Sequence, residues 1–177
     1  MIIPPLMFVF GHIGLTLLAF YLAEQWLPRL QGKVNYGFVA IGALLPDLID
    51  KPLGRFLLAD TLASGRIFAH TLSFWILVGL IIVLIWQKWR ADFLLVLPGA
   101  AVLHLLEDSM WQTPEVLFWP FLGWSFPADE IAGGFLDYLM HVFSNCYDPA
   151  ISMVFISEVF GIVICMVGAV RWYSRVK

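Results

Sequence analysis

The sequence is poor in charged residues. Asp, Glu, Lys and Arg make up 13% of its 177 residues, and the formal net charge is -3. Proteins that bind the phosphate backbone of a nucleic acid normally present a clustered basic face, so this composition argues against a nucleic-acid partner. Cysteine is also scarce: the chain has two, Cys146 and Cys165, and they do not form a CxxC pair. No thiolate metal site is therefore expected.

Hydrophobic side chains, in contrast, are abundant. They make up 61% of the sequence and give a mean hydropathy of +0.87, whereas a soluble domain is roughly 45 to 50% apolar. We therefore expect an integral membrane protein. A helix needs about 20 apolar residues to cross the hydrocarbon core, and long runs occur at residues 5–26, 68–86 and 150–172. Shorter runs, at residues 36–48 and 91–106, predict further helices, the second of them partly buried or broken at Pro98.

These runs predict an all-α fold, a polytopic helical membrane protein with about five helices in one bundle. A chain of this length leaves no room for a second folded domain of typical size, so residues 1–177 are expected to form a single membrane-embedded domain. The segment 109–147 is rich in Trp, Phe and Pro and predicts an interfacial cap with short helices. The first run has no basic start and no cleavage site, so it predicts a retained helix rather than a signal peptide.

The basic residues of the loops predict the orientation in the membrane. They follow the first, third and last long helices, at Arg29, Lys33, Lys88, Arg90, Arg171, Arg175 and Lys177. Because an excess of Lys and Arg marks the cytoplasmic side, we expect a multi-pass protein of the inner membrane. Its N-terminus is predicted to be external, or periplasmic, and its C-terminus cytoplasmic.

Several ionisable residues are predicted to meet at the external ends of these helices. They are His12, in the first helix, Asp47 and Asp50, which end the second, His70, which begins the third, and His104 and Asp108, which end the fourth. His12 lies about 8 residues into its helix, or about 12 Å below that side at about 1.5 Å per residue. The carboxylates can reach it only in a water-filled pocket.

The types and spacing of these residues favour a metal site. His104 and Asp108 are spaced i, i+4, and Asp47 and Asp50 are spaced i, i+3, so each pair shares one helix face. Imidazole and carboxylate without thiolate suit zinc in a catalytic site or another divalent transition metal. Such an ion lowers the pKa of bound water and polarises a phosphoryl oxygen, which is the equipment of a hydrolase.

Each of these residues also has an ordinary structural interpretation. His12 could make a hydrogen bond between helices. Asp47 and Asp50 could form a solvated helix end, and His104 and Asp108 an interfacial pair without a metal. Each interpretation is reasonable for one residue. They explain the whole set less well, because all of these residues would then have to lie at one membrane face by coincidence.

Four segments together carry a family resemblance. In chain order they are "FGHIGLTLLAF", "GALLPDLID", "GRIFAHTLSF" and "HLLEDSMWQTPEVLFWPF". This set resembles the bacterial and archaeal membrane-bound metal-dependent hydrolases, a family distantly related to zinc-dependent phospholipase C and P1-type nucleases. The resemblance implies one metal held by Asp47, His70, His104 and Asp108. It also implies that His12 is a ligand of a neighbouring metal.

The chain departs from the pattern of that family at several positions. Gly65 stands where a His is common and Ala69 where a Thr is common. The second carboxylate of "PDLIDKP" is also further from the first than usual. For the further metal of the soluble relatives the chain offers only His141, Asp137 and Glu158, and Asp137 with His141 is more typical of a surface pair.

Glu158 and Arg66 are the remaining candidates for the chemistry. Glu158 lies inside the last long run, and its functional interpretation is a metal ligand or general base; the alternative is a protonated carboxyl bonded between helices. Arg66, together with Lys51 and Arg55, could neutralise a substrate phosphate. The alternative for these cations is anchoring to lipid head groups.

The sequence thus predicts a membrane-embedded metal-dependent hydrolase that cleaves a phosphoester bond in a lipid or lipid-linked substrate through metal-activated water. The predicted metal ligands are His12, Asp47, His70, His104 and Asp108, and the predicted catalytic residues are Asp50, Arg66 and Glu158. The expected cofactor is zinc, with manganese as the alternative, as one ion or more. The substrate class follows from the membrane location alone, and the scissile bond and oligomeric state stay open.

The alternative hypothesis is a non-catalytic membrane protein that uses the same residues as a structural metal site or as an ion or proton pathway. A pathway needs polar residues that continue to the cytoplasmic side. Near the inner ends of the predicted helices the sequence has Glu24, Gln25 and Gln87, so a transport route ranks below hydrolysis.

Overall fold

The computed structural model describes residues 8–58, 61–62, 64–127, 136–137, 140, 143–144 and 153–176. Within these residues the chain is all α-helical, which confirms the predicted fold class. The helices are α1 (Val9–Trp26), α2 (Tyr36–Pro52), α3 (Leu72–Trp89), α4 (Val96–Glu107), α5 (Pro114–Leu117) and α7 (Met153–Val176). Short helical turns join them: η1 (Pro28–Leu30), η2 (Leu53–Leu57), η3 (Phe68–His70), η4 (Asp92–Leu95) and η5 (Met110–Gln112).

The five predicted helices correspond to α1, α2, α3, α4 and α7, with shifted ends that have local causes. Helix α3 begins at Leu72 because the Thr71 side chain caps it, accepting a hydrogen bond from the Phe74 backbone N–H and satisfying one of the first orphan donors. Pro98 does not break α4. It is the third residue of that helix, where the N–H that proline lacks has no partner within the helix.

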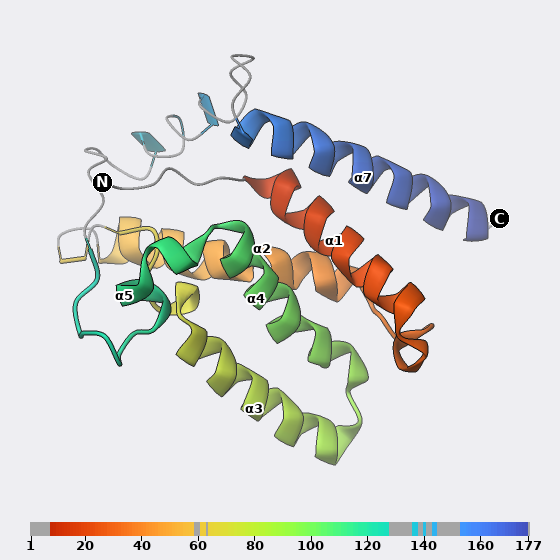
Figure 1. Cartoon of the computed structure of the whole chain (residues 1–177), viewed down its shortest axis with the longest axis horizontal. Helices are drawn as coiled ribbons and strands as arrows, with labels where there is room; N and C mark the ends of the chain where they lie inside the picture. Colours follow the sequence, from red (N-terminus) through yellow and green to blue (C-terminus); the bar gives the residue numbers. More distant parts are fainter. Residues whose placement is uncertain are drawn as a thin grey trace.

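The helices alternate in direction, so that their ends gather at two poles. Helices α1, α3 and α7 run one way and α2 and α4 the other (Figure 1). Helix α1 packs on α7 and α2, α2 packs on α4, and α4 packs on α3. The beginnings of α1, α3 and α7 and the ends of α2 and α4 therefore share one pole, here called the site pole. The connections at η1 and η4 lie at the other, the loop pole.

Two glycines allow α1 and α7 to touch backbone to backbone. A Cβ atom on Gly161 would lie 1.9 Å from the backbone oxygen of Phe10, and a Cβ atom on Gly14 would lie 2.4 Å from the Gly161 Cα atom. Small residues permit this close approach between helices in membranes. The contact fixes the first turns of α1, which carry His12, against α7.

Two helices of the described chain are long and apolar enough to cross a membrane. They are α3, over Leu72–Trp89, and α7, over Met153–Ser174. Only 11% of each span is buried inside the protein, so most of their apolar side chains face outwards, as lipid contact requires. Helix α1, the described part of the run predicted at residues 5–26, is not one of the two, because His12, Glu24 and Gln25 make it less apolar.

The described part of the predicted cap packs against the turn that carries His70. The Trp119 ring stacks on Phe126 and meets Phe68, in η3, edge-on with the ring centroids 5.5 Å apart. The Ser73 hydroxyl donates a 2.5 Å hydrogen bond to the Trp119 carbonyl. These contacts tie the aromatic segment to the beginning of α3. Most of the cap beyond residue 127 lies outside the described residues.

Candidate metal centre

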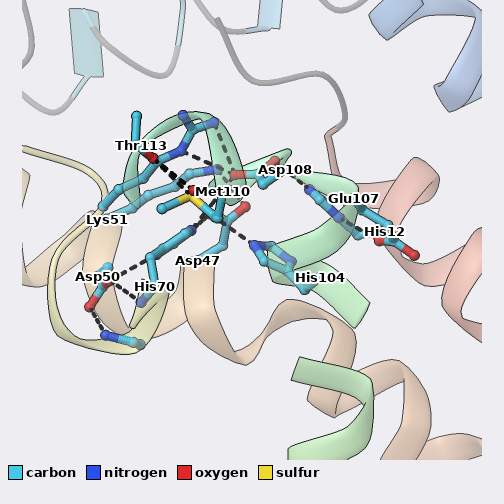
Figure 2. Close-up of polar contacts among 12 residues, drawn as sticks. His12, Asp47, Asp50, Lys51, His70, His104, Glu107, Asp108, Met110 and Thr113 are labelled. Atoms are coloured by element: carbon cyan, nitrogen blue, oxygen red, sulfur yellow. Dashed lines mark hydrogen bonds and ion pairs between the residues drawn. The ribbon is translucent and has the colours of Figure 1, made fainter. Parts of the chain in front are cut away.

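The fold brings all five predicted metal ligands together at the site pole. Two overlapping groups have donor atoms within 4.8 Å of one another: His12, Asp47 and His104 form the first, and His70, His104 and Asp108 form the second. The residues come from α1, α2, η3, α4 and the position after α4 (Figure 2). We call these five residues the cluster. The rest of the chain positions them through the helix packing described above.

Each histidine of the cluster leaves one ring nitrogen without a hydrogen bond. All three rings are at most 1% exposed, and among the described residues no Nε2 atom has a hydrogen-bond partner. A buried polar atom without a partner costs about 1 to 3 kcal/mol, and such atoms call for an explanation such as an ion. Three of them at one place fit a cation that accepts their lone pairs.

The Nε2 atoms face the carboxylates of the cluster at distances longer than a hydrogen bond. The distance is 3.4 Å from His12 Nε2 to Asp108 Oδ1, and 3.6 Å from His70 Nε2 to Asp47 Oδ1. His104 Nε2 lies 3.8 Å from the same Asp47 oxygen. Hydrogen bonds between nitrogen and oxygen are about 2.7 to 3.2 Å long. The spacing leaves the donors arranged around a common centre without bonding one another directly.

The other ring nitrogen of each histidine is firmly held. Nδ1 lies 2.8 Å from Glu107 Oε2 in His12, 2.8 Å from Asp50 Oδ2 in His70 and 2.7 Å from the Ala43 carbonyl in His104. A carbonyl or carboxylate oxygen accepts, so Nδ1 carries a proton in each ring, and Nε2 is the nitrogen that offers a lone pair when the imidazole is neutral. Histidines that bind metals have this arrangement, with the outer partner fixing the ring and its tautomer.

The two carboxylates of the cluster are held in the same way by cations. Arg66 donates to Asp108 Oδ2 from Nε at 3.1 Å, and its Nη2 lies 3.0 Å from that oxygen. Lys51 Nζ lies 2.5 Å from Asp47 Oδ2. Burial by itself raises the pKa of Asp108, but the adjacent Arg66 guanidinium holds that pKa well below its ordinary value. Asp108 is therefore an ionised carboxylate, the form that binds metals.

Arg66 and Lys51 thus have a first role that the sequence did not reveal. The sequence left them two interpretations, neutralising a substrate phosphate or anchoring to lipid head groups, and in the structure each is paired with a carboxylate of the cluster. The Arg66 side chain is 18% exposed and the Lys51 side chain 15%. The cations therefore orient Asp108 and Asp47 and balance their charge.

The structure gives Asp50 a different place from the predicted catalytic one. Its side chain is fully buried, and Oδ2 accepts hydrogen bonds from the backbone N–H groups of Ile67 and His70 and from His70 Nδ1. Oδ1 accepts from the Ala69 N–H. Neither oxygen is directed at the Nε2 atoms of the cluster. Asp50 therefore holds the η3 turn through its backbone N–H groups and orients the His70 ring.

Glu158 also lies apart from the cluster. Its Oε1 accepts from the backbone N–H groups of Phe8 and Gly11, at 3.0 and 2.7 Å, and its Oε2 accepts from that of Phe10 at 3.1 Å. These are donors of the first turn of α1, which no carbonyl of the helix itself can satisfy. The carboxylate caps α1 from α7, where the positive end of the helix also favours it. The contacts are those of a helix cap, and Glu158 belongs to neither group of donors.

Glu107 is the residue of this site that the sequence interpretation missed. It is part of the segment "HLLEDSMWQTPEVLFWPF", and it lies three residues after His104 and therefore near the same helix face. In the structure it bonds both His12 and Thr16. A carboxylate spaced i, i+3 from a candidate histidine was the available signal.

The other candidates lie outside the cluster or outside the described residues. Asp137 is described and belongs to neither group of donors. His141 and Cys146 lie outside the described residues, so the Asp137 and His141 pair stays a prediction. Cys165, in α7, is a free and partly exposed thiol.

The fold and the cluster define a helical membrane protein with a buried His and Asp site that could hold a metal ion. The chain belongs to the family described as YdjM inner membrane protein, whose model matches residues 7–176. This is a family of predicted membrane metal-dependent hydrolases, which agrees with the resemblance found in the sequence, and it places the chain in the inner membrane. Comparisons with curated proteins and with solved structures gave no match.

Proposed function

We propose that the protein is a membrane-embedded metal-dependent hydrolase that cleaves a phosphoester bond in a lipid or lipid-linked substrate. One observation carries the proposal: three buried Nε2 atoms without partners converge with two carboxylates. Every residue of that cluster has an outer partner that orients it. Preorganised donors of this kind distinguish a metal site from a chance meeting of polar side chains.

The donors fit zinc, with manganese as the alternative. They are imidazole nitrogens and carboxylate oxygens without thiolate, a set typical of catalytic zinc and of related divalent metals. His104 Nε2 belongs to both groups of donors, and a single lone pair binds one ion at a time. We therefore expect one ion per chain, whereas the resemblance implied a neighbouring second one.

The residues around the cluster have separable tasks in this proposal. A divalent ion, when bound, supplies Lewis-acid stabilisation of a phosphoryl oxygen and lowers the pKa of a water ligand. Asp50 and the Ala43 carbonyl keep the Nε2 lone pairs of His70 and His104 available. Arg66 and Lys51 balance the charges of Asp108 and Asp47, and both are partly exposed side chains of a type that binds phosphate.

The membrane location supports the choice of substrate class. The site lies at one pole of a bundle (Figure 1) whose α3 and α7 are mostly unburied apolar helices, and a substrate that is itself held in the bilayer suits that location. Phospholipids and polyprenyl phosphate derivatives are the substrates to test first. The predicted orientation puts this pole on the periplasmic side, where an accessibility map of cysteines introduced beside Asp47 and His104 would test it.

The deciding experiment measures metal and turnover on the same detergent-purified protein. Elemental mass spectrometry should find about one zinc or manganese ion per native chain, and hydrolysis should be seen with a panel of phospholipids and polyprenyl phosphates. The double variant His104→Ala, Asp108→Ala should lose both, because two of the five donors are gone. The matched control is Glu115→Gln, an exposed carboxylate on α5, which should retain both.

The other outcomes separate the proposal from its alternative. Metal that is lost in the double variant, without hydrolysis of any phosphoester in the panel, would favour a structural metal site. A native protein that binds no divalent metal after reconstitution would refute the hydrolase.

A further inference from the structure

We propose that Glu107 is a positioning residue of the metal site. It fixes the ring of His12 so that the Nε2 lone pair faces the other donors, and Thr16 fixes Glu107 in turn. The inference rests on the proposed function, since it assigns His12 to the metal. It assigns a function to the Glu107 carboxylate and to the Thr16 hydroxyl, neither of which is among the predicted ligands.

Both oxygens of Glu107 are engaged by helix α1. Oε2 lies 2.8 Å from His12 Nδ1, and Oε1 accepts a 2.9 Å hydrogen bond from the Thr16 hydroxyl. His12 and Thr16 are four residues apart on α1, and so lie on the same face of that helix. The carboxylate is therefore held at two points, and its position against His12 is defined by α1 and not only by its own helix.

The contact determines which nitrogen of His12 is available. A carboxylate accepts the Nδ1 proton, so the lone pair of the neutral ring is on Nε2, and an anionic acceptor also raises the basicity of the ring. Nε2 then points at the cluster, 3.4 Å from Asp108 Oδ1. The His12 ring is 1% exposed and the neighbouring His104 ring is fully buried. The surrounding side chains therefore leave the His12 ring little room to turn.

His12 is also coupled to the central donor of the site. Its ring stacks on that of His104, with the centroids 3.9 Å apart and the planes 25° from parallel. A displaced His12 ring would therefore disturb His104, whose Nε2 belongs to both groups of donors. The effect of Glu107 should reach beyond the single ligand that it contacts.

An ordinary bond between helices would not require the pattern that the three histidines share. Each of them uses Nδ1 for an outer partner and leaves Nε2 without one. Glu107 does for His12 what Asp50 does for His70 and what the Ala43 carbonyl does for His104. The repetition on three separate elements assigns the contact to the metal site.

The test measures metal affinity by chelator competition on the full-length protein in detergent. Glu107→Ala should bind zinc about 10- to 100-fold more weakly, the range found for outer partners of metal ligands. Glu107→Gln should lose less, because its amide oxygen can still accept the Nδ1 proton, although without the charge. Thr16→Val keeps the shape of the side chain but removes the hydroxyl and should give the smallest loss. Glu115→Gln is the control and should match the native protein.

The absorption spectrum of the cobalt-substituted protein gives a second readout. Cobalt reports ligand geometry, so Glu107→Ala and Glu107→Gln should shift the visible bands, whereas Glu115→Gln should not. Melting of the metal-free variants separates positioning from folding. A variant that loses stability but keeps native zinc affinity and the native cobalt spectrum would overturn the proposal.

The outcomes keep this proposal distinct from the hydrolase itself. If Glu107→Ala binds zinc like the native protein while His104→Ala does not, the positioning role is refuted and the metal centre stands. If the native chain binds no metal, both are refuted. If Glu107→Ala does not fold, Glu107→Gln and Thr16→Val decide, and native affinity and spectra in both would overturn the role.

Discussion

The two poles of the molecule use polar side chains in opposite ways. At the loop pole Glu24 accepts from the Tyr36 hydroxyl, and Arg171 donates to the Tyr21 hydroxyl at 3.1 Å in an exposed contact. At the site pole the polar atoms are buried, and three ring nitrogens have no partner among the described residues. Exposed polar pairs contribute about 0 to 1 kcal/mol, whereas buried unpaired atoms are costly. Only the site pole therefore points to a ligand.

The largest effect on the site pole is expected when Asp50, the acceptor that holds His70, is removed. Asp50→Ala leaves His70 Nδ1 and the three buried backbone N–H groups that Asp50 accepts from without their partner. At about 1 to 3 kcal/mol for each of these four unsatisfied groups, the free energy of unfolding should fall by at least about 4 kcal/mol. Thermal melting in detergent measures this, and chelator competition should show weaker zinc binding.

Asp50→Asn is the matched variant, because it keeps the shape and one acceptor oxygen. It should melt between the native protein and Asp50→Ala. Native stability and native zinc affinity in Asp50→Ala would contradict the role assigned to this residue.

A smaller effect is expected at Glu158, which is buried like the cluster but is fully paired. Glu158→Ala removes the acceptor for three N–H groups at the beginning of α1. Because water can reach part of this turn, the free energy of unfolding should fall by about 1 to 3 kcal/mol in total. Metal content at saturating zinc should stay at the native level.

The same variant separates a helix cap from a catalytic group. A folded, metal-loaded Glu158→Ala protein should keep its hydrolytic turnover. Loss of turnover without loss of stability or metal would restore the general-base interpretation of Glu158.

The smallest effect is expected at the loop pole. Arg171→Ala removes an exposed contact with Tyr21, and substitutions at such places usually change stability by less than about 0.5 kcal/mol. Melting temperature, metal content and turnover should all match the native protein. A loss of zinc in this variant would show that the two poles are coupled, and would contradict the conclusion that only the site pole determines metal binding.

The sequence predicted the helices because their signal is local. Long apolar runs indicate helices in a membrane protein, and five runs correspond to α1, α2, α3, α4 and α7. The ends were less predictable. The Thr71 cap shortens α3, and Pro98 falls in the first turn of α4 instead of breaking it.

The candidate site was only partly predictable for a related reason. His12, Asp47, His70, His104 and Asp108 stand out as ionisable residues at helix ends that share one pole. Asp50 and Glu158 have the same chemistry and the same kind of position, and the sequence could not separate them from ligands. Their oxygens are occupied by backbone N–H groups of other segments, which a linear pattern does not display.

The sequence by itself determined the class of the protein, the order of its helices and the set of residues available at one pole, because hydrophobicity and residue type act locally. The tertiary structure decided which of those residues face a common centre. The partner that holds Nδ1 is 95 residues from His12, 20 from His70 and 61 from His104. A neutral imidazole offers a lone pair at Nε2 when its proton is on Nδ1, and an acceptor beside Nδ1 favours that tautomer. In this chain folding brings that acceptor into place.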